Sequence, residues 1–252
     1  MTEKAIDINA LPALTSVDDS CSLLASGPSA GRVSMAKLRE TVMGDVSLAA
    51  VMDGVFIMYH GKSDNYPRMV KPHKWPSMQT SGEVADGVVI VEGGKMLVVA
   101  PTEADSAGLL WSSAAMSGGA VTTTDRVTAM DDWNGKANTA SIISKSTSGA
   151  VANTAAYAPG FCNLYSYGGL GTGKWWLPSA GELMMIYANM TKINYALSLI
   201  TGATQLAEMG YWTSTEYSAP LAWYLRLPTG YLACPSKAST MLRVRPVSAF
   251  IQ

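Results

Sequence analysis

This sequence is poor in the residues that build metal sites and disulfide frameworks, with two histidines and three cysteines among 252 residues. Cys21, Cys162 and Cys234 lie far apart and form no CxxC pair. Such a set makes neither a disulfide framework nor a structural zinc site by itself. We therefore interpret the cysteines as small buried or incidental thiols, and we expect no bound metal.

Charge is also low, because charged residues make up 15% of the chain and the formal net charge is −1. Nucleic acid is not expected as a partner, since phosphate binding needs a basic surface. No stretch approaches the roughly 20 apolar residues of a membrane-spanning helix, so no membrane insertion is expected. The start carries Glu3, Lys4 and Asp7 where a signal peptide has an apolar core, which predicts synthesis in a cytoplasm.

The usual signatures of catalysis are missing as well. His60 and His73 lie in a connection broken by prolines, and we expect both at the surface. No P-loop, HExxH or GxSxG motif occurs, and the glycine-rich residues 168–174 lack the P-loop spacing. Asp131 and Asp132 are better interpreted as a helix cap than as an acid–base pair. We therefore expect neither an enzyme nor a cofactor.

Three regions follow from composition. Residues 1–50 carry scattered leucines and a short helix candidate over residues 33–42, but they are too few to bury a core alone. We expect them to form an attachment or oligomerisation segment. Residues 51–84 are predicted as a connecting strand (54–61) and a linker, and residues 85–252 as the main domain.

Within the main domain, β-branched runs flank Gly93 and Gly94, which predicts a hairpin because both turn residues tolerate positive φ. A helix is predicted over residues 133–145 with Trp133, Ala137, Ala140 and Ile143 on its buried stripe. Residues 144–173, rich in Gly, Ser, Tyr and Asn, are predicted to form a long loop.

The strongest local signal is a capping box, in which Ser179 precedes Glu182 by three positions. Apolar residues then recur at steps of three and four up to residue 200, which predicts one amphipathic helix of about five turns. Short strands follow over residues 211–217, 222–227, 230–235 and 241–247. Apolar residues alternate with outward-facing residues along these strands, which places every second side chain in the core. The predicted core residues are Trp176, Leu183, Ile186, Trp212, Trp223, Leu225, Leu227 and Val244.

Residues 173–250 resemble the C-type-lectin-fold proteins that include the variable proteins of diversity-generating retroelements, and the similarity extends from about residue 85. The matching residues are Trp176–Ser179, Glu182, Leu183, Tyr211, Trp212, Ser214–Tyr217, Ala222–Tyr224, Gly230, Lys237 and Val244–Val247. Residues 8–20 and 31–40 resemble attachment segments of phage tail fibres, on shorter runs. The resemblance implies an α+β, C-type-lectin-like fold with two helices and small antiparallel sheets.

In those retroelement systems a ligand-binding face is diversified by mutagenesis directed at adenines, usually in AAC or AAT codons, and such codons cannot become codons for Met, Trp, Gln, Lys or Glu. Between Ser218 and Thr240 only Trp223 and Lys237 belong to these types, and both match framework positions. An ordinary edge strand broken by prolines remains the alternative. The expected variable face comprises Pro220, Leu221, Tyr224, Arg226, Pro228, Thr229, Tyr231, Ala233, Cys234, Pro235, Ser236, Ala238, Ser239, Thr240 and Leu242. Tyr224, Arg226 and Tyr231 are its expected anchors.

The resemblance implies a phage tail-fibre or host-adhesion protein, located in the virion, that binds a bacterial surface protein or glycan. The N-terminal segment would bind other virion proteins, and a homotrimer is expected by analogy. Residues 132–134 mimic only part of the calcium signature of animal lectins, so calcium-dependent sugar binding is not expected. A bacterial cell-surface or fimbrial adhesin and a purely structural virion subunit remain alternatives. A formylglycine-generating-type enzyme is disfavoured because Cys234 has no nearby cysteine in the sequence.

Overall fold

The computed structural model describes residues 22–25, 31–34 and 53–250. The chain divides into a unit of residues 1–51 and a compact unit of residues 52–252. In the first unit, β1 (Ser22–Ala25) and β2 (Gly31–Ser34) form an antiparallel pair. The first two residues of the helix predicted over 33–42 belong to β2, and the others lie outside the described residues. Most of the predicted attachment segment also lies outside them.

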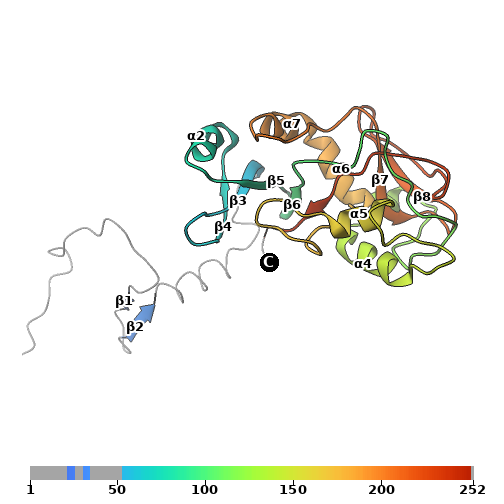
Figure 1. The fold of residues 1–252 in the computed structure, drawn as a ribbon, viewed down its shortest axis with the longest axis horizontal. Coiled ribbons are helices and arrows are strands. Elements are labelled where there is room, and N and C mark those ends of the chain that lie inside the picture. The colour runs from blue at the N-terminus through green and yellow to red at the C-terminus, as the bar shows by residue number, and fades with distance from the viewer. Residues whose placement is uncertain (1–21, 26–30, 35–52, 251–252) are drawn as a thin grey trace, which may run out of the picture. The chain divides into compact units, whose positions relative to one another are not determined.

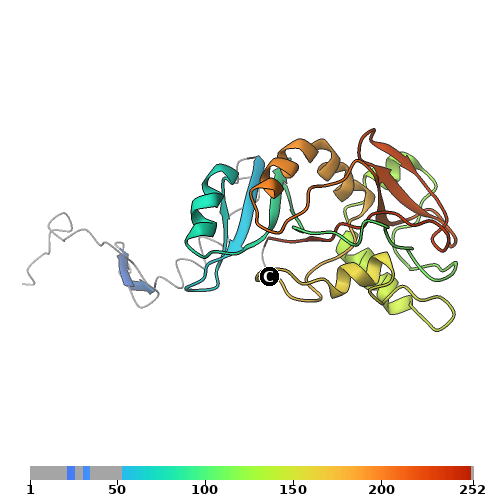
Figure 2. The ribbon, with the colours of Figure 1, turned by 45° about the horizontal axis from the view of Figure 1, so that its top comes forward.

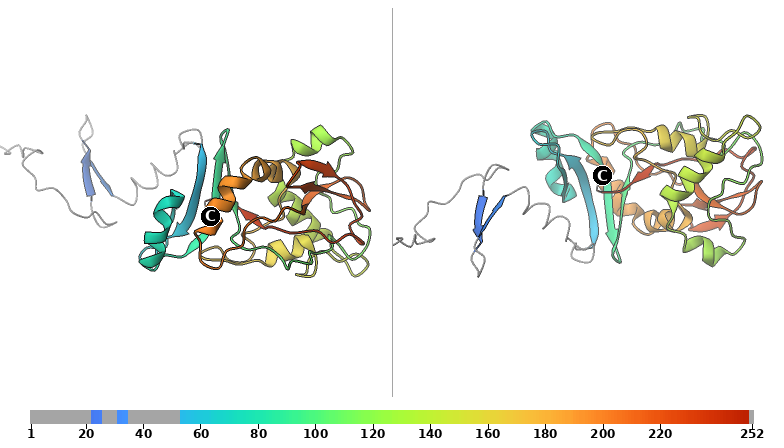
Figure 3. Two further views of the ribbon diagram at one scale, coloured as in Figure 1. Left: turned by 90° about the horizontal axis from the view of Figure 1, so that it is seen from above. Right: turned by 90° about the horizontal axis from the view of Figure 1, so that it is seen from below.

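The second unit contains a five-stranded antiparallel sheet in the order β10-β6-β5-β3-β4 (Figures 1 and 3). Its strands are β3 (Gly54–His60), β4 (Pro67–Val70), β5 (Ala85–Glu92), β6 (Lys95–Val99) and β10 (Val247–Ser248). β3 pairs with both β4 and β5. The residues predicted as a connecting strand and linker therefore contribute two strands to the main sheet, followed by η3 (Pro72–Lys74) and α2 (Trp75–Thr80).

The predicted hairpin is confirmed, since β5 turns into β6 through Gly93 and Gly94 at φ 56° and 76°. Positive φ at both turn positions matches the twist of the flanking strands, and glycine adopts it without a steric penalty. β5 is buried along its length except for Glu92, which accounts for its nearly continuous β-branched sequence.

The other sheet has three antiparallel strands in chain order, β7 (Gly210–Glu216), β8 (Ala222–Arg226) and β9 (Tyr231–Ala233). The predicted alternation is confirmed, because Trp223, Leu225 and Leu227 are buried. Residues 241–246, predicted as a strand with Val247, form only single bridges, such as Leu109 with Leu242 and Tyr211 with Arg243. Leu109 and Leu110 likewise form only single bridges.

The single helix predicted after the capping box is two helices, α6 (Ala180–Ala188) and α7 (Met190–Ser198), separated at Asn189. The capping box itself is confirmed. Asn189 is buried, and its side-chain amide donates to a Glu92 carboxylate oxygen at 2.6 Å and to the Met185 carbonyl at 3.1 Å. Its backbone (φ −109°, ψ 10°) departs from helical geometry at this point. The break therefore lies where a buried amide bonds a strand distant in the sequence.

Helix α4 (Gly135–Lys145) forms as predicted, but with a different face buried. The buried residues are Gly135, Asn138, Thr139 and Ile142, whereas Ala137 and Ala140 are exposed and Trp133 and Ile143 are half-buried. Gly135 is required there because a side chain would overlap the Glu182 carboxylate. The predicted stripe was wrong because polar side chains on the true face are hydrogen-bonded inside the protein.

Two further helices are α3 (Arg126–Met130) and α5 (Ala158–Leu164). α5 lies within the predicted loop of residues 144–173. It is short, begins with Ala158-Pro159 and contains Gly160, where any side chain would meet the backbone of Thr154. No helix among the described residues is long and apolar enough to span a membrane.

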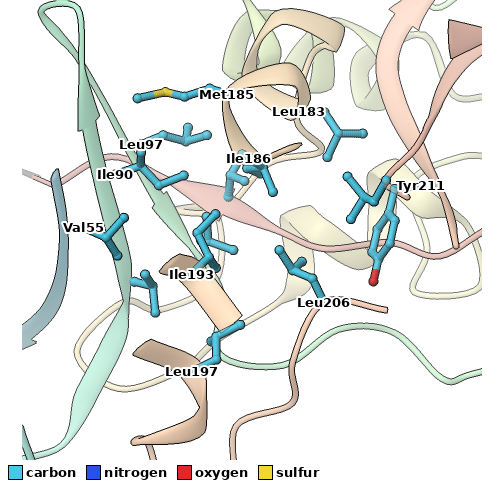
Figure 4. Packing of buried hydrophobic residues seen from close by; sticks show 14 of the residues in the cluster. Val55, Ile90, Leu97, Leu183, Met185, Ile186, Ile193, Leu197, Leu206 and Tyr211 are labelled. Carbon is cyan, nitrogen blue, oxygen red and sulfur yellow. The ribbon is translucent and has the colours of Figure 1, made fainter. Parts of the chain in front are cut away.

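The core lies between the two sheets and the helices (Figure 2). α7 packs on β3 and β5, and α6 packs on β7 and β8. In Figure 4, Val55, Ile90 and Leu97 of the five-stranded sheet point toward Ile186 and Ile193. A second cluster includes Trp111, Ile142, Cys162, Leu177, Trp212 and Val244. All the predicted core residues are buried, and the fold is of the mixed α+β class with small antiparallel sheets.

Candidate ligand-binding face

None of the residues predicted for the variable face is buried. They come from β8, β9 and the turns around them, near the red end of the ribbon in Figure 1. The exposed members are Pro220, Arg226, Pro228, Thr229, Tyr231 and Ser239, and the half-buried ones are Leu221, Tyr224, Ala233, Cys234, Pro235, Ser236, Ala238, Thr240 and Leu242.

The pairing of β8 with β9 explains this pattern. Arg226 pairs with Tyr231 and Tyr224 pairs with Ala233, so these four side chains share one face of the ribbon. Between them, Leu225 pairs with Leu232, and both are buried on the opposite face. The two-residue period therefore separates the accessible members of the predicted face from the core.

Three members of the predicted face also contribute to packing. Tyr224 and Leu242 pack against the second core cluster, and Cys234 packs against the first. A Cβ atom at Gly210 would lie 2.8 Å from the Tyr224 ring, so that ring lies directly over the glycine backbone. These positions support the fold more than Arg226, Pro228 or Ser239 do.

Lys237 holds the turn that precedes β8. Its buried Nζ donates to Glu216 Oε2 at 2.5 Å and to the carbonyls of Met116, Ser218 and Ala219 at 2.8, 3.0 and 3.1 Å. Desolvation lowers the pKa of Lys237, while the bond to Glu216 opposes this effect. The ammonium therefore fixes the base of the face and takes no part in its exposed surface.

Glu216 connects the same turn to residues 118–120. Its carboxylate accepts the amides of Gly118 at 2.9 Å and Ala120 at 3.1 Å in addition to Lys237. A second carboxylate, Glu103, accepts from the guanidinium groups of Arg243 at 2.8 Å and Arg245 at 3.1 Å. The face is thus held between two charged networks below its surface.

Asp132 has a different role from the predicted helix cap. It is buried, and Asn134 provides the cap position of α4. The Asp132 carboxylate accepts from Asn138 Nδ2 at 2.8 Å and from Thr215 Oγ1 at 2.7 Å, joining α4 to β7. It also accepts the Asn134 amide at 2.9 Å, a local bond of the kind expected from the sequence.

Glu182 is the carboxyl group whose titration is most altered by burial. Desolvation raises its pKa to about 7, although the Ser179 amide (2.8 Å) and the Trp176 Nε1 group (3.2 Å) donate to it and act in the opposite direction. It lies at the start of α6, inside the capping box. We assign it a structural role there.

His60 was predicted at the surface but is half-buried, with Nδ1 2.6 Å from Asp86 Oδ2. The other oxygen of the buried Asp86 accepts the Gly169 amide at 2.5 Å. Desolvation raises the pKa of Asp86. His73 is exposed, as predicted. Within residues 53–250, no group of three His, Cys, Asp or Glu side chains is arranged to hold a metal.

Both cysteines of the second unit are free. Cys162 is fully buried in the second core cluster, and burial raises the pKa of its thiol well above the ordinary value. Cys234 is half-buried beside the first cluster, and desolvation raises the pKa of its thiol as well. The two residues pack in different clusters.

Two features lie outside the predicted set. Arg126, at the first position of α3, has its guanidinium carbon 5.6 Å from the ring centroid of Tyr231. The sequence contains no signal that brings these distant residues together. A pocket of about 330 Å³ is lined by Glu92, Gly93, Lys95, Met130, Trp133, Gly181, Met184 and Met185, away from β8 and β9.

Comparison with protein-family models and with curated protein sequences found no match.

Proposed function

We propose that this chain is a receptor-binding protein of the phage tail-fibre type that displays a variable surface on a C-type-lectin-like fold. The observation that carries the proposal is the division of β8 and β9 into two side-chain sets. Arg226, Pro228 and Tyr231 are exposed, whereas Leu225, Leu227 and Leu232, which alternate with them, are buried. A protein that changes its ligand by substitution needs this separation, because exposed positions accept exchange at little cost to stability.

The buried networks support the same proposal. Lys237 lies inside the stretch proposed to vary and Glu216 lies just before it, yet both bond mainly backbone carbonyls and amides. Backbone groups are present whatever side chains surround them. The shape of the turn is therefore independent of the neighbouring exposed residues.

In this proposal the N-terminal segment holds the protein on the virion and assembles a homotrimer. The ligand is a protein or glycan on the bacterial surface. Most binding energy is expected from a few anchors, among them Tyr231 and Arg226, since aromatic and arginine residues dominate binding surfaces.

The test compares two sets of substitutions of equal size. One variant carries Arg226→Ser, Pro228→Ser and Tyr231→Ser, and the control carries Lys136→Ser, Lys174→Ser and Glu208→Ser at exposed positions elsewhere. We expect both proteins to melt near the wild-type temperature. Binding to a panel of bacterial strains should be lost or redirected only in the first. Unchanged binding by the first variant would refute the proposed face.

Diversification has a separate test in the neighbouring DNA. We expect a reverse transcriptase gene and a near-copy of the segment encoding residues 218–242 that differs mainly at adenines. Their absence would remove the retroelement part of the proposal, while the cell-binding test decides the receptor-binding part.

A further inference from the structure

Two arginines, one over the ring and one its cross-strand partner, accompany an exposed aromatic residue at the start of β9. Tyr231 is 53% exposed, and the Arg126 guanidinium carbon lies 5.6 Å from its ring centroid. Arg226 is the cross-strand partner of Tyr231, so the Cβ atoms of the pair are about 5 Å apart on one face. The cluster combines residues from α3, β8 and β9.

Neither guanidinium has a carboxylate partner within residues 53–250, where every ion pair involves other residues. Asp125 precedes Arg126 in the sequence, but its carboxylate accepts from Thr128 N and Thr128 Oγ1, both at 2.7 Å. Both arginines are exposed. In a chain of net charge −1, this is a local concentration of positive charge that the protein itself does not neutralise.

The chemistry of the cluster selects a ligand that is flat, polar and anionic. A guanidinium binds a carboxylate through two parallel hydrogen bonds, which gives directional recognition. The face of a tyrosine ring is electron-rich and packs against the C–H groups of a sugar ring. Thr229 Oγ1 accepts the Tyr231 backbone amide at 3.3 Å and places a hydroxyl in the turn before β9.

We propose that Arg126, Tyr231 and Arg226 form a subsite for an acidic sugar residue of a bacterial surface polysaccharide. This inference rests on the proposed function and names its ligand class. It assigns Arg126, which lies outside the variable stretch, as a fixed anchor of the face. One exposed ring with two arginines fits a single acidic sugar, whereas a protein partner needs a larger apolar centre, with about 800 Å² buried on each side.

The probe is polygalacturonate, with its fully methyl-esterified form as the neutral control. We expect the full-length protein to bind the acidic polymer at least about tenfold more tightly than the ester, since only the former offers charge-assisted bonds. Affinity should fall as salt is raised, because both guanidinium groups are solvent-exposed. Equal affinity for the two polymers would refute the subsite.

Variants then locate the contact. Arg126→Gln and Arg226→Gln should each weaken polygalacturonate binding by about fivefold or more, and Tyr231→Ala should do the same. Arg126→Lys keeps the charge but loses the planar fork, so we expect an intermediate affinity. The matched control Lys174→Gln removes one exposed positive charge elsewhere and should leave binding unchanged. An equal loss in the control would overturn the assignment to this cluster.

Polyglutamate distinguishes an acidic protein from an acidic glycan. If it binds through Arg126 and Arg226 while polygalacturonate does not, the glycan assignment is wrong. Failure of the subsite is separable from failure of the proposed function. Strain-specific cell binding that is lost on exchange of the face but insensitive to Arg126→Gln would refute the subsite and leave receptor binding standing.

Discussion

Lys237 Nζ lies 2.5 Å from Glu216 Oε2, and both side chains are almost completely buried. The lysine has a neighbouring aromatic as well, with Nζ 4.3 Å from the Trp111 ring centroid. A charge buried in this way is tolerable only because Nζ donates to the Glu216 carboxylate and to three backbone carbonyls. The pair therefore joins three parts of the chain: the residues before α3, the end of β7 and the segment after β9.

Replacing Lys237 by Met should destabilise the protein by about 3–5 kcal/mol, because Glu216 is left buried without its counter-charge. Denaturant unfolding measures this. The double variant Lys237→Met/Glu216→Gln should recover part of the loss, and Lys174→Met at an exposed position should cost less than about 0.5 kcal/mol. A loss below about 1 kcal/mol in the single variant would contradict a structural role of the pair.

The pKa of Glu182 predicts a pH dependence of stability. Its pKa is raised from 4.5 to about 7 in the folded protein, so the folded state binds more protons than the unfolded state between these values. The free energy of unfolding should therefore fall as pH rises through this window, by up to about 3 kcal/mol at about 1.4 kcal/mol per pKa unit. Glu182→Gln should flatten the curve, whereas Glu208→Gln, at an exposed position, should leave it unchanged.

The division of β8 into core and surface predicts opposite effects of neighbouring substitutions. Trp223→Ala removes a buried ring, its bond to the Thr123 carbonyl at 2.9 Å and its contact with Tyr217, and should cost about 3–5 kcal/mol. Tyr224 is half-buried, so Tyr224→Ala should cost clearly less. Thermal melts of the two variants decide the order. The reverse order would mean that the assigned face is inverted.

Oligomerisation is predicted to depend on the N-terminal segment. Full-length protein should scatter light as a homotrimer, and a chain starting at Met52 should be a monomer, since residues 52–252 form a compact unit by themselves. An equal number of subunits per particle in the two proteins would show that residues 1–51 do not assemble the oligomer.

Local signals in the sequence predicted the elements whose stability is local. Gly93 and Gly94 define a hairpin by their own conformational freedom, and Ser179 with Glu182 defines a helix start. The alternation in β8 identified Trp223 and Leu225 as core because a half-buried strand sorts its side chains by polarity.

Two of the failures, the buried face of α4 and the break between α6 and α7, share one physical cause, a polar side chain that is buried because another element bonds it. Asn138 and Thr139 face inward on α4 because Asp132 and the Leu177 backbone satisfy them, and a hydrophobic period cannot detect this. Asn189 interrupts a helix because Glu92 lies beside it. The contact between Arg126 and Tyr231 joins two exposed residues far apart in the sequence, and it exists only once the sheet and α3 have assembled.

The pairing of β10 with β6 has a consequence for synthesis. β10 follows the predicted variable stretch in the chain, so all residues of the proposed ligand face are synthesised before the strand that pairs with β6. Until then β6 presents unpaired backbone groups, which are a template for aggregation. Under the proposed diversification, a substitution in the face that prevents β10 from docking would leave this edge of β6 open and expose the chain to aggregation or proteolysis.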